Sequence, residues 1–309
     1  MKKNEFFYAI IVVVALVFVF GCNEGDNAVK EGPFISGVGG VSVEFVQLAP
    51  PENFDQGKEV PLKMVLKNKG EYDLVAGRAK VKIYGVNSID FGLSTGYKGT
   101  TGVLSGIGEF RSEGGRQDVD FGKINYKQSI VNSQDFELWA KLCYPYQTKA
   151  LIDVCMKSTV SEEADEGEIC SLAGEKIKGG MVSAGPVQLT SVKQETRGSD
   201  QVRFDFVIEN KGTGNIYASD ALCEDLDDEF KKLESRNKVN VEIVRPLDIL
   251  CRFASGEDSN KGVVILDSGV GDLSCWKTVD ETYEDKLGVV LSYVYTDTIT
   301  KTVTIYEKV

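Results

Sequence analysis

Acidic, aromatic and sulfur-bearing side chains are the residues of this chain that could bind a ligand or carry a reaction. Asp225, Asp227 and Asp228 could supply the paired carboxylates that glycoside hydrolysis requires. Trp139 and Trp276 could each stack on a sugar ring. Aspartate-rich loop surfaces are common, and tryptophans more often serve in packing. We therefore interpret these residues as a surface loop and as structural packing groups.

Histidine is absent from the 309 residues. Its absence excludes Ser-His-Asp and Cys-His catalysis, and any zinc site that uses a histidine ligand. The glycine-rich stretch at residues 92–100 superficially resembles a phosphate-binding loop, but it lacks the G-x₄-G-K-[ST] spacing. We predict that the protein is not an enzyme, has no catalytic residues, and uses no cofactor or metal.

Disulfide formation is the chemistry that the cysteines favour. Six cysteines follow the N-terminal segment: Cys143, Cys155, Cys170, Cys223, Cys251 and Cys275. An even number outside the cytoplasm indicates three disulfides, with fifteen possible pairings. A metal–thiolate site is the alternative, although the chain contains no C-x₂-C pair.

Two arguments narrow the pairing. Cys143 and Cys155 fall on the non-core parity of one predicted hairpin, so they could face each other across it. Three of the six cysteines lie before the end of the predicted domain boundary and three lie after it, so at least one bridge must cross the division. We expect Cys170 to form that bridge, with Cys223, Cys251 or Cys275 as its partner.

The N-terminus has the layout of a secretory signal. Lys2 and Lys3 precede the apolar run Phe6–Gly21, which is short for a bilayer span of about 20 residues. The ending Val-Phe-Gly-Cys resembles a lipoprotein signal, in which Cys22 would carry the lipid. An uncleaved signal anchor and simple secretion are the alternatives. All three place the rest of the chain outside the cytoplasm.

Two strand patterns occur twice in the same order. An alternating apolar strand ends in Asn-Lys-Gly at residues 62–70 and again at residues 202–212. A second alternating strand follows each copy, at residues 79–83 and 238–243. Alternation with period two, bounded by a glycine-containing turn, predicts half-buried strands.

A long hairpin is the third repeated feature, expected at residues 136–154 and 287–305. Each copy contains a Tyr-x-Tyr sequence on the apolar parity. These tyrosines are Tyr144 and Tyr146 in the first copy and Tyr293 and Tyr295 in the second. Three features in the same order, with consistent parity, predict a repeated fold.

The pattern predicts an all-β protein with two tandem Ig-like antiparallel β-sandwich domains after an N-terminal hydrophobic anchor. The expected divisions are an anchor at residues 1–22, a flexible tether at 23–36, a first sandwich at 37–160, a linker at 161–184 and a second sandwich at 185–309. A short helix or 3₁₀ turn is expected at residues 223–233, inside an enlarged loop. The acidic linker is interpreted as a solvated loop, because a calcium site would need a ligand spacing that it lacks.

The strand patterns carry a resemblance to a known class of module. The segments Val43–Ile83 and Val187–Ile243 resemble cell-adhesion-related Ig-like modules of prokaryotic surface proteins. The paired Tyr-x-Tyr segments are similar to those of archaeal surface proteins that carry such modules. The resemblance implies an Ig-like fold at the cell surface and brings no catalytic residues.

The charge of the chain bears on its partners. A net charge of -12 argues against nucleic-acid binding, which needs basic surfaces. We predict a non-catalytic interaction or structural module on the extracytoplasmic face of the cell membrane or at the cell surface. Its partner would be another envelope or cell-surface protein, and its N-terminus would contact the membrane. The alternative is a surface lipoprotein that binds a carbohydrate or solute through the loops at residues 92–108 and 213–236.

Overall fold

The computed structural model describes residues 32–157, 169–198, 200–256 and 258–308. The predicted anchor, Cys22 and most of the predicted tether lie outside these residues. The described residues form one compact unit, in which antiparallel sheets predominate. The prediction of an all-β protein is confirmed. No helix within the described ranges is long and apolar enough to cross a bilayer.

A three-stranded N-terminal sheet has the order β1-β3-β6. Its strands are β1 (Val41–Phe45), β3 (Val60–Asn68) and β6 (Arg116–Ile124). The alternation of β3 buries Leu62, Met64 and Leu66. One face of the sheet therefore belongs to the hydrophobic core.

A five-stranded C-terminal sheet has the order β13-β12-β15-β9-β8. Its strands are β13 (Asp258–Ser259), β12 (Leu250–Arg252), β15 (Val270–Thr278), β9 (Gln201–Asn210) and β8 (Val187–Arg197). Strand β9 is the counterpart of β3 and buries Val202, Phe204 and Phe206 by the same alternation. Both copies of the first repeated pattern are therefore strands in the structure.

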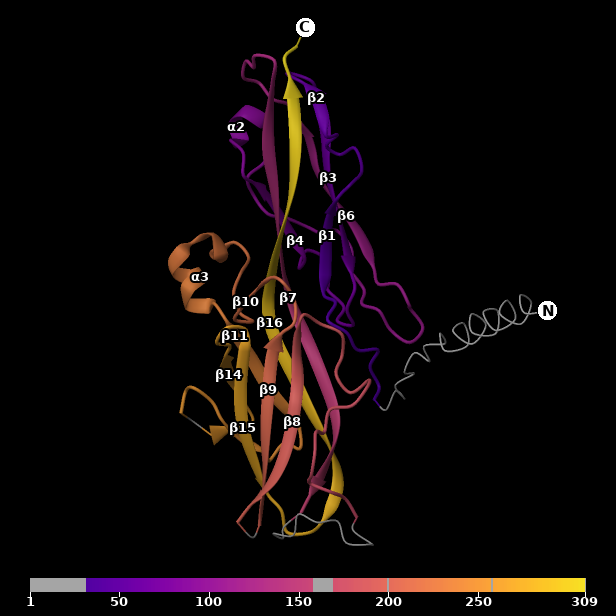
Figure 1. Ribbon diagram of the computed structural model, residues 1–309, viewed down its shortest axis with the longest axis vertical. Coiled ribbons are helices and arrows are strands. Elements are labelled where there is room, and N and C mark those ends of the chain that lie inside the picture. The colour runs from indigo at the N-terminus through magenta and orange to yellow at the C-terminus, as the bar shows by residue number, and fades with distance from the viewer. Residues whose placement is uncertain (1–31, 158–168, 199, 257, 309) are drawn as a thin grey trace, which may run out of the picture. The chain divides into compact units, whose positions relative to one another are not determined.

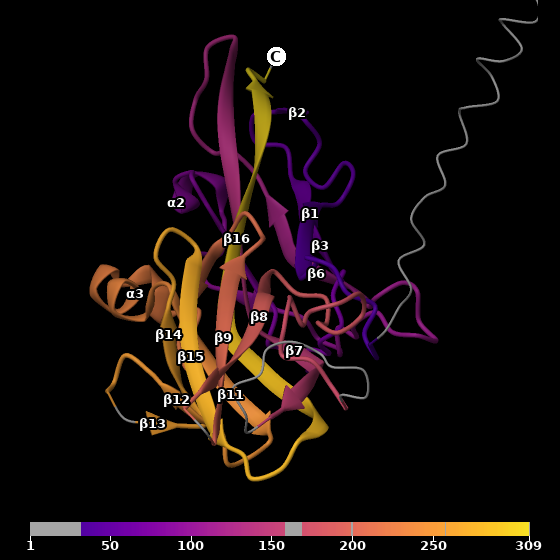
Figure 2. The ribbon, with the colours of Figure 1, turned by 60° about the horizontal axis from the view of Figure 1, so that its bottom comes forward.

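The central sheet has the order β14-β11-β16-β7-β4-β5, and β10 and β2 also pair with β16. Its strands are β14 (Lys261–Ile265), β11 (Lys238–Arg245), β16 (Tyr283–Tyr306), β7 (Ser133–Met156), β4 (Lys80–Tyr84), β5 (Lys98–Gly99), β10 (Asn215–Tyr217) and β2 (Asn53–Asp55). Figures 1 and 2 show the N-terminal sheet beside one end of β16 and the C-terminal sheet beside the other. All three sheets share one hydrophobic core.

The expectation of two long hairpins was wrong. Strands β7 and β16 are each continuous over 24 residues, and they pair with each other along that whole length. The inward alternation continues without a break through Tyr144 and Tyr146, whereas a turn would interrupt it. Pro145 is tolerated because the pairing of β4 with β7 extends only to Cys143, so Pro145 needs no N–H for that neighbour.

Strands from both expected domains therefore meet in one sheet. The end of β16 pairs in parallel with β2, so Ile305 lies beside Phe54. The described part of the expected linker also packs on the unit: Leu172, Met181 and Val182 are buried. The division at residues 161–184 thus lies within a single unit, in which both halves contribute strands to one central sheet.

The Asn-Lys-Gly sequences hold the strand ends of both halves in the same way. In the first half, Tyr146 Oη donates to Asn68 Oδ1 at 3.1 Å and accepts the N–H of Tyr72 at 3.3 Å. In the second half, Tyr295 Oη lies 3.5 Å from Asn210 Oδ1 and accepts the N–H of Gly214 at 2.7 Å. The repeat inferred from sequence is therefore also a repeat of contacts.

A local two-fold relation follows from the pairing of the long strands. Tyr146 lies opposite Tyr293, and Tyr144 lies opposite Tyr295. The hydroxyls of the other two tyrosines accept hydrogen bonds from the first residue of the strand that begins each half. Tyr144 Oη accepts the N–H of Val41 at 3.1 Å, and Tyr293 Oη accepts the N–H of Val187 at 3.3 Å. Burial of these hydroxyls is possible because each has a hydrogen-bond partner.

The three disulfides differ from the expected pairing. Cys155 bonds to Cys170, and Cys251 bonds to Cys275. Cys143 and Cys155 cannot face each other, because the expected hairpin is a single strand. The remaining bridge, Cys143–Cys223, joins the two halves, so one bridge crosses the division as the count of cysteines required.

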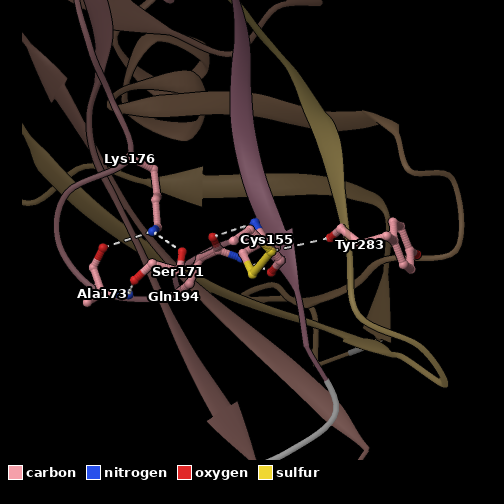
Figure 3. The surroundings of a disulfide bond; sticks show 7 residues. Cys155, Ser171, Ala173, Lys176, Gln194 and Tyr283 are labelled. Carbon is pink, nitrogen blue, oxygen red and sulfur yellow. Dashed lines mark hydrogen bonds between the residues drawn. A yellow bond between two sulfur atoms is a disulfide. The ribbon is translucent and has the colours of Figure 1, made fainter. Parts of the chain in front are cut away.

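The Cys155–Cys170 bridge fastens the segment after the acidic linker to the end of β7 (Figure 3). Gln194 holds the backbone of Cys155 from β8: its Oε1 accepts the Cys155 N–H at 3.0 Å, and its Nε2 donates to the Cys155 carbonyl at 2.7 Å. Lys176 Nζ donates to the carbonyls of Ser171 and Ala173. The expected role of Cys170 as a bridge to the second half was therefore wrong.

Candidate ligand site on the outer face of the central sheet

The enlarged loop contains two short helical segments, η1 (Asp225–Asp227) and α3 (Glu229–Ser235), which confirms the helical turn expected there. The loop lies on the face of the central sheet that points away from the core. The Cys143–Cys223 disulfide fixes it to β7. Beneath it lies a small separate cluster of buried residues: Cys143, Tyr217, Cys223, Leu226 and Val294.

The outer face beneath the loop is an ordered grid, set by the register of three strands. Lys82 of β4 lies opposite Lys141 of β7, which lies opposite Thr298 of β16. In the adjacent row, Tyr84 lies opposite Trp139. The side chains of successive rows point to the same side, because outward residues recur every second position.

A polar hollow of about 330 Å³ lies between this grid and the loop. Its volume is at the lower end of the range for small-molecule sites. Its lining comes from both halves of the chain. The residues are Lys82, Tyr84, Lys141, Asn215, Tyr217, Leu226, Asp227, Glu229, Lys232, Thr296 and Thr298.

Asp227 is the electrostatic centre of the hollow. Its carboxylate lies 2.7 Å from Lys82 Nζ and 3.5 Å from Lys141 Nζ. Burial lowers the pKa of Lys141, and the nearby Asp227 charge offsets part of that shift. Lys232 of α3 lies 3.4 Å from Glu229 at the same hollow. Three ammonium groups thus share two carboxylates.

Tyr97 brings the glycine-rich loop to the same place. Its ring packs against the cluster beneath the enlarged loop, and Lys82 Nζ lies 5.9 Å from the ring centroid. Within the described ranges, Tyr97 Oη is the buried side-chain polar atom that has no hydrogen-bond partner. Burial, followed by the charges of Asp227 and Glu224, raises the pKa of Tyr97 well above its ordinary value. The two loops expected to form a ligand site therefore do meet.

The three aspartates of the enlarged loop have separate structural roles. Asp225 pairs with Lys231 at 2.6 Å. Asp228 caps α3, where its side chain accepts the N–H groups of Phe230 and Lys231. Asp227 binds the two lysines of the grid. Each of the three carboxylates therefore has its own partner, in the loop or in the grid.

The two tryptophans have different surroundings. Trp139 is 38% exposed, and its ring lies 5.7 Å from that of Tyr84 at the hollow. Trp276 lies on the outer face of the C-terminal sheet, with the guanidinium groups of Arg197 and Arg252 over its ring. Trp139, rather than Trp276, is therefore next to the candidate site.

The glycine-rich stretch also contains a G-x-S-x-G spacing at residues 92–96. Ser94 is exposed and follows the short helix α2 (Ser88–Phe91), instead of standing between a strand and a helix. Without histidine, and in this position, the serine does not form a nucleophile elbow.

Sequence reasoning did not identify Lys82, Lys141, Tyr84, Lys232 or Tyr97. The sequence pattern places Lys82 and Lys141 on the side of their strands that faces away from the core. That they lie opposite each other depends on the register of two strands far apart in the chain. No local signal in the sequence reports that register.

No protein-family model matches the chain, and no curated protein matches it. Among solved structures, the CupB6 tip adhesin from Pseudomonas aeruginosa is similar over 88% of this chain and 98% of that chain, at 8% identity and a TM-score of 0.17. A TM-score this low carries no inference about the function of this chain.

Proposed function

We propose that the protein is an extracytoplasmic, envelope-anchored interaction or structural module that binds another envelope component without catalysing a reaction. The observation that carries this proposal is the set of three disulfides in one compact all-β unit. Disulfides of this number persist mainly in oxidising compartments outside the cytoplasm. The signal-like N-terminus supports the same location.

One open sheet edge, that of β14, supports an interaction role, whereas another edge strand, β8, is not available. The edge of β8 is covered, because Glu175 accepts the N–H of Val192 and Lys176 donates its N–H to the Val192 carbonyl. Strand β14 also ends a sheet, and no described strand pairs with its outer side. The N–H of Leu266 donates to the carbonyl of Asn237, next to β11, and N–H groups along a strand point alternately to its two sides. The N–H of Val263, three residues earlier, therefore points to the open side. Such an edge can accept a strand from a partner.

In-cell photocrosslinking tests this proposal. A photoreactive amino acid placed at Val263 in the full chain should give a crosslink to an envelope component. The same group at Val239 on β11, which is buried, is the matched control. Val263→Pro should remove the interaction without opening the ladder to β11. Recovery of the protein from the cytosol with reduced thiols, or no envelope crosslink from Val263, would contradict the proposal.

Binding of a carbohydrate or solute is the second candidate function. The polar hollow between the outer grid and the enlarged loop favours it, because the hollow combines aromatic, amide, hydroxyl and charged groups. A ligand and an envelope partner are compatible, because β14 and the hollow are formed by different strands of the central sheet.

A further inference from the structure

The local two-fold relation allows the residues of the hollow in the first half to be compared with the equivalent residues of the second half. Lys82 and Lys141 lie opposite each other in the first half, and the equivalent pair in the second half is Glu242 and Val290. Both halves form the same strands, so the fold does not require two lysines at this position. Like charges directly opposite in an antiparallel pair are destabilising. The lysine pair is therefore a feature of the first half alone, where Asp227 of the enlarged loop bridges both ammonium groups.

The enlarged loop is the other feature found in one half. Between the Asn-Lys-Gly turn and the second repeated strand, the first half has residues 71–79 before β4, whereas the second has residues 213–237, which include β10, before β11. The longer segment lies over the first half's lysines and is fastened there by the Cys143–Cys223 bridge. Both departures from the repeat thus concern the same hollow.

The charges of the hollow suit an anionic group. Lys82, Lys141 and Lys232 face the two carboxylates of Asp227 and Glu229, which leaves one positive charge in excess. The chain as a whole carries a net charge of -12, so a cationic surplus here does not follow from composition. A ligand carboxylate could accept charge-assisted hydrogen bonds from the lysines in this partly enclosed space.

The rest of the lining suits a sugar ring. Tyr84 and Tyr217 give the lining an aromatic surface, and the ring of Tyr84 packs against Trp139 outside the lining. Asn215, Tyr217 and Thr298 add amide and hydroxyl groups that can donate to or accept from ligand hydroxyls. A simple inorganic anion would leave this aromatic and amide part of the lining unused.

We propose that the hollow binds a carboxylate-bearing saccharide, with its carboxylate at Lys141 and Lys82 and a sugar ring against Tyr84. The assignment rests on the proposed extracytoplasmic role of the protein, and it names a ligand class for the second candidate function. The saccharide occupies the space between the grid and the disulfide-anchored loop, and no covalent step is involved.

Calorimetry on the full-length chain in detergent tests the assignment. The probe is tetragalacturonate, and its fully methyl-esterified form is the neutral control of the same size. The acid should bind, the ester should bind at least about tenfold more weakly, and added salt should weaken the acid further. Equal binding of both probes, or binding of neither, would overturn the assignment. Full competition by inorganic sulfate would show that the hollow is a simple anion site, and this would also overturn the saccharide assignment.

Variants locate the site. Lys141→Val introduces the residue type that the second half carries at the equivalent position, and should weaken binding of the acid by roughly tenfold or more. Tyr84→Ala should weaken the acid and the ester alike. The matched control is Lys149→Met, which removes an exposed lysine on the same face of β7 away from the hollow and should leave binding unchanged. Unaltered affinity in Lys141→Val with intact disulfides would place the ligand elsewhere and refute the site.

The two proposals can fail separately. If tetragalacturonate does not bind but the crosslink from Val263 persists in the Lys141→Val protein, only the ligand assignment falls. If the saccharide binds as described but Val263 captures no envelope component, the partner proposal falls and the ligand site stands.

Discussion

The buried tyrosines of the local two-fold make stability sensitive to alkaline pH. Burial is the main cause that raises the pKa values of Tyr144, Tyr146 and Tyr293 well above the ordinary tyrosine value near 10. In the unfolded chain these groups ionise near pH 10, so above that pH the unfolded state has lost protons that the folded state keeps. Stability therefore falls as pH rises. At pH 11 the loss is about 1.4 kcal/mol per tyrosine, or about 4 kcal/mol for the three.

A loss of this size is a large part of the 5 to 15 kcal/mol that is typical of a folded domain. We expect the urea midpoint to fall steeply between about pH 10 and pH 11. In a stopped-flow jump to about pH 11, exposed tyrosines should ionise at once, and the buried ones only as the chain unfolds. Tyr146→Phe removes one of the buried groups, so it should reduce the slow tyrosinate amplitude and leave the fast one unchanged. Ionisation of every tyrosine in the fast phase would refute the reasoning.

Four further variants test packing and the anchoring of the loop. Replacing Cys143 and Cys223 by alanine opens an 80-residue loop and should lower the free energy of unfolding by roughly 4 kcal/mol; an unchanged urea midpoint would contradict this. Gly70→Ala places a Cβ atom 2.1 Å from a buried tyrosine hydroxyl and should cost about 2 kcal/mol or more, while Gly96→Ala meets nothing within 4 Å and should be near neutral in thermal melts. Equal effects would argue against that contact. Lys80→Met removes an exposed ion pair with the enlarged loop and should cost less than about 1 kcal/mol in the same melts; a cost above that of the lost disulfide would show that charge, and not the bridge, anchors the loop.

Local patterning was sufficient for the strands and for their duplication. The alternation of β3 and β9 and the matching Asn-Lys-Gly turns were visible in the sequence. The structure explains why those turns recur, because Asn68 and Asn210 each sit beside a tyrosine hydroxyl from a long strand. Side-chain parity is a local property, so sequence reasoning could identify it.

The pairing of the long strands was not accessible in the same way. Tyr144-Pro145-Tyr146 suggested a turn, because proline is common in turns. The free energy that keeps β7 straight comes from its 24 pairs with β16, whose partner residues are more than a hundred positions away. The cysteine pairing failed for the same reason: the outward parity of Cys143 was right, but its partner Cys223 is brought to it by a loop from the other half.

The shared central sheet also determines where a ligand site can form. Lys82, Tyr84 and Lys141 come from the first half, whereas Asn215 and Lys232 come from the second. Neither half contains a complete lining, so the hollow exists because β7 and β16 join the halves. In two independent tandem domains, the enlarged loop of the second would have no fixed position over the lysines of the first. The continuous strands and the Cys143–Cys223 bridge fix that position. The enlarged loop of one half and the lysine pair of the other half can therefore form one defined surface.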